Sequence, residues 1–478
     1  MSETLMILAP ELILTATLLA VLLSDAARWR SFAYLLALSG TLCALLASAL
    51  APRGTVGDQL AIDAWAALAR PAILLSAVLL LMAARSLHDD DDGPAWAALL
   101  LALALGALVT AASAHLLPLW LGLELMSLSG YALAGWRAGS RRSAEAGMKY
   151  VLFGGAASAL SLYGMSHLYG LAGRLDFAGI GAMLAVDQPL PVTAALLIAS
   201  VGLAYKLTLV PFHYYAPDVY QGAPPLAVAS VGTLPKIAAI AVLVRALSSA
   251  VPESLVSPAS VGGLLALLAT ASLLVAALTA VVARDAQRII AYSAIAHAGS
   301  MVLALAARPH SSATAAAAFY LAAYVPATIG ALLALALLAP TAGRTALVEL
   351  AGSGQRRPWT GVALVVCLAS LAGLPPLAGF LAKWGVLRAA LEVGLGAPER
   401  SVLLWAAGAL LLSTAISAWA YLLIIRAVFF QPAPAQQTTA ASPLPPGVAA
   451  VLALCVAATL ALGLWLSGFA VLLHSLHP

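Results

Sequence analysis

The chain has 478 residues, of which 63% are hydrophobic and 9% are charged, and its formal net charge is +4. A soluble globular protein carries roughly 45–50% apolar and about 25% charged residues, so this composition excludes a soluble enzyme with an ordinary polar surface. The three cysteines, Cys43, Cys367 and Cys455, lie singly in apolar runs. They form no metal-binding spacing, which argues against a disulfide framework, a zinc site or an iron–sulfur site. The sequence therefore predicts an integral membrane protein, whose small positive charge calls for no nucleic-acid partner.

Apolar runs follow one another along the whole chain, and a spanning helix needs about 20 mostly apolar residues. The fourteen runs are residues 5–23, 32–50, 62–84, 95–113, 115–135, 148–170, 190–210, 225–248, 260–282, 288–306, 313–338, 360–390, 402–428 and 447–473. The first run is not typical of a signal peptide, because Glu3 and Glu11 replace the expected basic segment. The predicted fold class is an all-α polytopic membrane protein with about 14 transmembrane helices.

Four ionisable residues are predicted to lie deep inside these runs. Three of the four lysines, Lys206, Lys236 and Lys383, fall in such runs. Glu124 is the carboxylate that lies deep in a run, at 115–135. A charge at the middle of the bilayer costs about 2.5–3.5 kcal/mol even on the most lenient scale, and leucine would avoid this cost. Because a buried lysine can release its proton whereas arginine stays charged, these residues are typical of a proton path. The alternative is a structural ion pair, but the one carboxylate cannot pair with three lysines.

Prolines interrupt two of the predicted helices close to these lysines. Lys206 precedes Pro211 in GLAYKLTLVPFHYYAPDVYQGAPP, and Lys383 follows Pro375 and Pro376 in SLAGLPPLAGFLAKWG. Proline removes a helix N–H, and irregular backbone at membrane depth is tolerated only inside protein or beside water. The broken helices are the seventh and the twelfth. Their separation by five helices predicts two inverted five-helix repeats, which are common in transporters.

These observations divide the chain into five predicted segments. They are helices 1–3 (residues 1–94), a first repeat of helices 4–8 (95–250), a second repeat of helices 9–13 (258–430), a Pro/Ala-rich linker (431–446) and helix 14 (447–478). If the N-terminus lies outside, the inner loops hold thirteen basic residues and the outer loops hold seven, among them Arg70 and Arg245. The excess of positive charge on the cytoplasmic side predicts that both termini lie outside.

Two histidines are secondary candidates for the same path. His297 falls inside the tenth run, one helical turn after Ser293, and His213 follows the proline break of the seventh helix. For His297, a core histidine bonded to a hydroxyl group and a proton relay both stay open. The run HDDDDG, residues 88–93, is interpreted as a solvated loop rather than a metal site.

Four blocks of the sequence resemble a known family: PFHYYAPDVYQGAPP, KYVLFGGAASALSLYG, RIIAYSAIAHAGS and SLAGLPPLAGFLAKWG. They resemble the antiporter-like subunits of bacterial NADH–quinone oxidoreductase (respiratory complex I), and the PDVYxGAP block is typical of the subunit N family. The resemblance covers residues 95–430 and implies fourteen helices with inverted repeats. The sequence departs from the family pattern at Gln221, where a glutamate is usual, and at Ser300, where an aromatic residue is usual.

The resemblance also implies roles for the buried charges. Glu124 matches the glutamate of the fifth helix, and Lys206 matches its partner lysine on the broken seventh helix. Lys236 matches the central lysine of the eighth helix, and Lys383 matches the residue near the proton exit on the twelfth.

The family relationship further implies a location, partners and cofactors. The chain is expected in the bacterial inner membrane, beside sister antiporter-like subunits, small membrane subunits and a peripheral arm. NADH, FMN, iron–sulfur clusters and quinone are expected in those partners, and no cofactor or metal is expected in this chain. A subunit of a multisubunit sodium/proton antiporter, a subunit of a related membrane-bound oxidoreductase and a non-conducting scaffold remain the alternatives.

Overall fold

A computed structural model describes residues 2–26, 30–87, 93–184, 189–251, 261–308, 311–339, 345–396, 401–432 and 444–465. Most of the predicted solvated loop at 88–93, most of the linker at 431–446 and the end of the last predicted helix lie outside the described residues. The described chain is helical almost throughout. This follows from its composition, because a helix satisfies its own backbone hydrogen bonds where no water is available.

The helices are α1 (Ser2–Ile7), α2 (Ala9–Ala26), α3 (Arg30–Leu50), α4 (Ala64–Arg85), α5 (Gly93–Ala112), α6 (Leu116–Ala134), α7 (Arg141–Ala172), α8 (Phe177–Leu184), α9 (Pro189–Ala199), α10 (Val201–Leu207), α11 (Ala216–Gly222), α12 (Pro225–Ser249), α13 (Val261–Val282), α14 (Ala286–Ala306), α15 (Ser311–Leu338), α16 (Ser353–Arg356), α17 (Pro358–Ala372), α18 (Ala378–Leu395), α19 (Ser401–Phe430) and α20 (Pro446–Leu464). Within the described residues, each predicted apolar run coincides with one of these helices or with a pair of them. Ten helices of the described chain are long and apolar enough to cross a membrane, or eleven if α9 and α10 form one span. The all-helical membrane fold is confirmed, and the count of fourteen spans stays a prediction.

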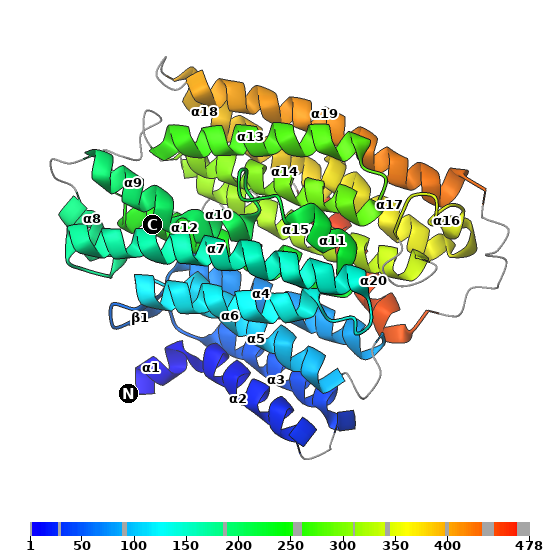
Figure 1. Cartoon of the computed structure of the whole chain (residues 1–478), viewed down its shortest axis with the longest axis horizontal. Coiled ribbons are helices and arrows are strands. Elements are labelled where there is room, and N and C mark those ends of the chain that lie inside the picture. The colour runs from blue at the N-terminus through cyan, green and yellow to red at the C-terminus, as the bar shows by residue number, and fades with distance from the viewer. Residues whose placement is uncertain are drawn as a thin grey trace. The chain divides into compact units, whose positions relative to one another are not determined.

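The chain divides into two compact units. The first unit comprises Met1–Leu133, Val151–Leu207 and Thr233–Ser257, and the second comprises Ala134–Tyr150, Thr208–Gly232 and Pro258–Pro478. Within the first unit, α2, α3, α4 and α5 pack side by side (Figure 1). Within the second unit, α13 packs against α14 and α19, and α15 packs against α17 and α18.

The sequence patterns did not predict the short helices α8, α11 and α16, nor a short hairpin of β1 (Gly54–Val56) and β2 (Leu60–Ile62). The two strands pair antiparallel, with Thr55 opposite Ala61. The hairpin packs on a small apolar cluster that contains Ile7 of α1 and Ile62. It therefore ties the loop between α3 and α4 to the start of the chain.

Two helices are broken, as the prolines predict. α9 and α10 meet at an angle of 42° around Ser200, and the helix ends at Leu207, before the residue Thr208 with a left-handed backbone (φ 61°). The bend at Ser200 lies upstream of the prolines, so Pro211 accounts only for the second interruption. α17 ends at Ala372 with Gly373 in the left-handed region (φ 86°), and α18 begins after the two prolines.

Candidate proton-relay site

Glu124 and Lys206 lie in the first unit, on α6 and α10. Lys206 is 3% exposed, and its Nζ atom lies 5.9 Å from the ring centroid of Tyr131 and 5.7 Å from that of Tyr205. Aromatic faces attract a cation at these distances. Glu124 supplies the negative charge that acts on Lys206, and its carboxylate accepts a hydrogen bond from Ser158 of α7. The structure therefore brings together the pair that the sequence predicts, and adds two aromatic rings and a hydroxyl group.

Lys236, on α12, is completely buried. Its Nζ atom donates a hydrogen bond to the carbonyl oxygen of Leu207, at 2.8 Å. Leu207 is the last residue of α10, and a carbonyl at the end of a helix has no donor within that helix. The central lysine thus binds the carbonyl that the helix break exposes, one residue after Lys206.

Lys383 makes the same kind of contact at the other break, in the second unit. Its Nζ atom donates to the carbonyl oxygen of Ala372, at 3.0 Å, and Ala372 is the last residue of α17. Gly373 follows in the left-handed region, and a Cβ atom there would lie 2.9 Å from Cδ of Lys383. Both broken helices therefore end in a carbonyl that accepts a hydrogen bond from a lysine.

His297 is buried among hydroxyl groups of the second unit. Its Nδ1 atom lies 2.8 Å from the hydroxyl of Tyr320, and its Nε2 atom lies 3.5 Å from that of Tyr421. The Tyr421 hydroxyl also bonds with Ser293, which lies one helical turn before the histidine on α14. The hydroxyl groups that reach His297 therefore come from α15 and α19. A single sequence cannot reveal this arrangement.

His213 lies in the non-helical segment between α10 and α11 and is 6% exposed. Its ring is 4.4 Å from that of Tyr214. Its Nδ1 atom has no hydrogen-bond partner in the part of the chain that the structure describes. His213 is thus placed at the break as expected, but among the described residues no hydrogen bond joins its ring to another candidate residue.

The structure corrects the sequence analysis on two buried arginines. Arg70 was assigned to an outer loop, but it lies inside α4, with a side chain 1% exposed, and forms a two-point ion pair with Glu11 at 2.8 and 2.9 Å. Arg245 was also assigned to an outer loop. It is buried on α12 and pairs with Asp63 at 2.7 Å, while it donates to the carbonyl of Ala111. Among the described residues of the first unit, the carboxylate buried most deeply is therefore Glu11, at 7% exposed, whereas Glu124 is only half-buried.

These arginines differ from the lysines in their contacts. Each arginine donates two hydrogen bonds from its guanidinium group to the two oxygens of one carboxylate. This two-point contact is typical of a structural ion pair. Lys236 and Lys383 instead donate to backbone carbonyls. No group of three or more His, Cys, Asp or Glu side chains that could hold a metal ion occurs among the described residues.

This is a polytopic helical protein with two broken helices, and the last carbonyl before each break accepts a hydrogen bond from a lysine. These features are those of the antiporter-like membrane subunits. Residues 113–398 match the family described as NADH:quinone oxidoreductase/Mrp antiporter. The chain is 33% identical to NADH-quinone oxidoreductase subunit N of Geobacillus kaustophilus, over 97% of this chain and 95% of the relative. It is 34% identical to subunit N of Sphingopyxis alaskensis, over 90% of each chain.

Solved structures agree with these relatives. A chain of respiratory complex I from Thermus thermophilus is 34% identical, covers 95% of this chain and superimposes with a TM-score of 0.80. A chain of the Mrp complex from Dietzia has a TM-score of 0.80 at 21% identity, which shows a shared fold alone. The chain belongs to the NADH:quinone oxidoreductase/Mrp antiporter family, and within it to the subunit N group of respiratory complex I.

Proposed function

We propose that this membrane subunit of complex I moves protons through Glu124, Lys206, Lys236 and Lys383. The observation that carries the proposal is the fully buried Lys236, whose Nζ atom binds the carbonyl of Leu207 at the helix break. An ionisable side chain buried this deeply among apolar helices is costly, and proteins keep such groups where they serve an ion or proton path. The freed carbonyl supplies an acceptor without adding a second permanent charge.

The mechanism follows from the placement of the charges in the first unit. A protonated Lys206 is stabilised by Glu124 and by the rings of Tyr131 and Tyr205. Leu207 follows Lys206 directly in the chain. A change in the charge or position of Lys206 therefore also affects the Leu207 carbonyl, which accepts the hydrogen bond from Lys236. Repulsion between two ammonium groups then favours release of a proton from one of them. Alternation between the two lysines would move one proton per cycle of the pair.

Lys383 is assigned the corresponding role at the second break, and His297 a role beside it. Histidine and tyrosine hydroxyl groups can each donate and accept a proton, so the contacts of His297 with Tyr320 and Tyr421 supply relay partners. His213 is retained as a further candidate because it is buried at the first break.

The driving force is assigned to partner subunits. In this proposal NADH, FMN, iron–sulfur clusters and quinone are bound by the peripheral arm and by neighbouring membrane subunits, and this chain belongs to an H⁺-translocating NADH:quinone oxidoreductase (class EC 7.1.1.-). The chain lies in the bacterial inner membrane with both termini on the outer side. The excess of basic residues in the opposite loops supports this orientation.

The test uses membranes that contain the intact complex. Glu124→Ala is expected to slow NADH-driven proton uptake and NADH oxidation together, because Lys206 loses its counter-charge. Arg356→Ala, a change on the short helix α16, is the control that should leave both rates near those of the wild type. Normal proton uptake in an assembled Glu124→Ala complex would instead support the reading of this subunit as a scaffold.

A further inference from the structure

The turn of α12 that leads to Lys236 is loosened by a proline. Pro235 lies inside this helix, directly before Lys236. In an α-helix each carbonyl accepts a hydrogen bond from the N–H four residues later, and proline has no N–H, so the carbonyl of Val231 lacks the donor that a helix usually provides. The next carbonyl, that of Gly232, is the usual acceptor for the N–H of Lys236. What holds the Gly232 carbonyl therefore also affects the position of Lys236.

A tyrosine of α15 holds this carbonyl from outside the helix. The hydroxyl of Tyr324 donates to the carbonyl oxygen of Gly232 at 3.1 Å, and both residues belong to the second unit. The ring of Tyr324 also lies against that of His297, with the ring centroids 5.3 Å apart. Tyr320 and Tyr421 use their hydroxyl groups on the nitrogens of His297, whereas Tyr324 uses its hydroxyl on α12. Tyr324 thus contacts both the candidate relay histidine and the loosened turn.

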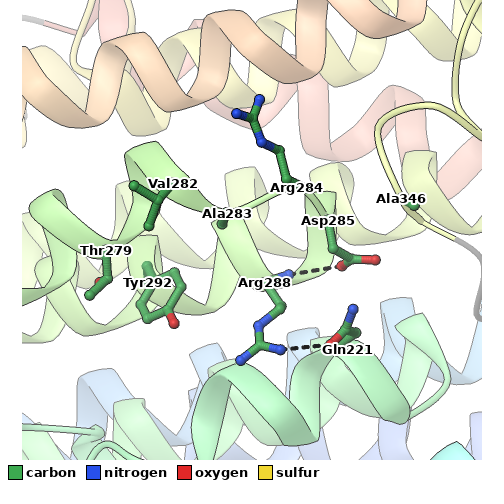
Figure 2. A pocket seen from close by; sticks show the side chains of 9 residues that line it. All are labelled: Gln221, Thr279, Val282, Ala283, Arg284, Asp285, Arg288, Tyr292 and Ala346. Atoms are coloured by element: carbon green, nitrogen blue, oxygen red, sulfur yellow. Dashed lines mark hydrogen bonds between the residues drawn. The ribbon is translucent and has the colours of Figure 1, made fainter.

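A second tyrosine lies next to the same turn and limits its movement. A Cβ atom added at Gly232 would lie 2.6 Å from the hydroxyl of Tyr220, a buried side chain of α11. The position of α11 is fixed by α14, because Arg288 donates to the side chain of Gln221 at 3.0 Å, beside the pocket shown in Figure 2. Hydroxyl groups from α15 and from α11 therefore both lie at the Gly232 turn.

We propose that Tyr324 is a positioning residue that couples the charge of His297 to the position of Lys236, a role that rests on the proposed proton path. An aromatic ring attracts a cation within about 6 Å, so a protonated His297 binds the ring of Tyr324 more strongly than a neutral one does. The hydroxyl of Tyr324 transmits this change to the carbonyl of Gly232. The helix transmits it to Lys236, four residues later, because the missing N–H of Pro235 lets this turn adjust.

The test uses the intact complex in membrane vesicles, and each rate of NADH-driven proton uptake is divided by the amount of complex assembled on a native gel. Tyr324→Phe removes the hydroxyl and keeps the ring, so uptake should fall about two- to tenfold, the scale of one neutral hydrogen bond. The matched control is Tyr163→Phe, which should leave uptake unchanged. Tyr163 also packs its ring on a histidine, with a centroid distance of 4.5 Å to His167, but it is exposed on α7.

A double-variant cycle separates this coupling from a merely structural role. His297→Gln and Tyr324→Phe should together slow uptake by less than the product of their separate factors, because both act on the same step. Gly232→Ala is a second variant that removes no donor but crowds the hydroxyl of Tyr220, and it should also slow uptake. Glu124→Ala is measured alongside these variants as the test of the proposed function itself.

Wild-type uptake in an assembled Tyr324→Phe complex, with slow uptake in Glu124→Ala, would overturn this inference alone and leave the proposed proton path in place. Separate factors of Tyr324→Phe and His297→Gln that simply multiply would overturn it too, because Tyr324 would then act independently of the histidine. If Tyr324→Phe does not assemble, Gly232→Ala decides, and wild-type uptake in that complex contradicts the inference. Normal uptake in Glu124→Ala would contradict the proposed function and this inference with it.

Discussion

Replacing Arg70 with methionine removes one half of a buried ion pair and leaves Glu11 without a counter-ion. The guanidinium group donates from Nε and Nη2 to the two carboxylate oxygens at 2.8 and 2.9 Å, and the two side chains are 1% and 10% exposed. Breaking a buried pair in this way costs about 3–5 kcal/mol, because the remaining charge stays desolvated. Since a typical domain is stable by only about 5–15 kcal/mol, Arg70→Met should reduce the amount of assembled complex.

The matched variant replaces both partners, Arg70→Met with Glu11→Leu, and should regain most of the lost stability. The assay is the temperature at which half of the complex is lost from a native gel, with Arg426→Met as the exposed control. Proton uptake per assembled complex should equal that of the wild type in every variant, because the pair is structural. If the complex with Arg70→Met alone is as stable as the wild type, this reasoning is refuted. An assembled variant complex with impaired proton uptake would refute it as well.

Three further changes test the relay. Lys236→Arg keeps a donor for the Leu207 carbonyl but cannot release its proton, so NADH-driven proton uptake in vesicles should fall about a hundredfold, the scale of a lost acid–base group. Ser158→Ala removes the hydrogen bond to Glu124, and the same assay should show a loss of at least about tenfold, because a hydrogen bond to a charged group is worth about 1.5–3 kcal/mol. Tyr421→Phe removes the hydroxyl near Nε2 of His297 and should slow proton uptake without altering assembly on a native gel. Wild-type rates in any of these variants would exclude that residue from the path.

The sequence predicted the helical membrane fold because apolar runs and charges are local properties of the chain. The broken helices were also predictable, since proline acts on the helix that contains it. The bend at Ser200 was not, because no proline lies there and the packing of α7 against Ala199 occurs only in the folded unit. Ser161 of α7 donates to the Ala199 carbonyl at 2.6 Å, and an added Cβ at Gly164 would clash with the backbone at that point.

The contacts of the candidate site could be predicted only in part. The sequence placed Glu124 and Lys206 in apolar runs, but it could not show that Ser158 and two tyrosine rings surround them. It also assigned Arg70 to a loop, because the partner Glu11 is 59 positions away and no local pattern connects the two. Hydrogen bonds between distant helices depend on the packing of side chains, which one sequence does not reveal.

The most direct test of the account is quinone-linked, NADH-driven proton uptake in membrane vesicles that carry Lys236→Ala, with assembly checked on a native gel. The buried lysine and its bond to Leu207 place this residue at the centre of the proposed path. The account predicts an assembled complex in which proton uptake and NADH oxidation fall together. Normal assembly with normal proton uptake would contradict it and leave this subunit as a scaffold of the membrane arm.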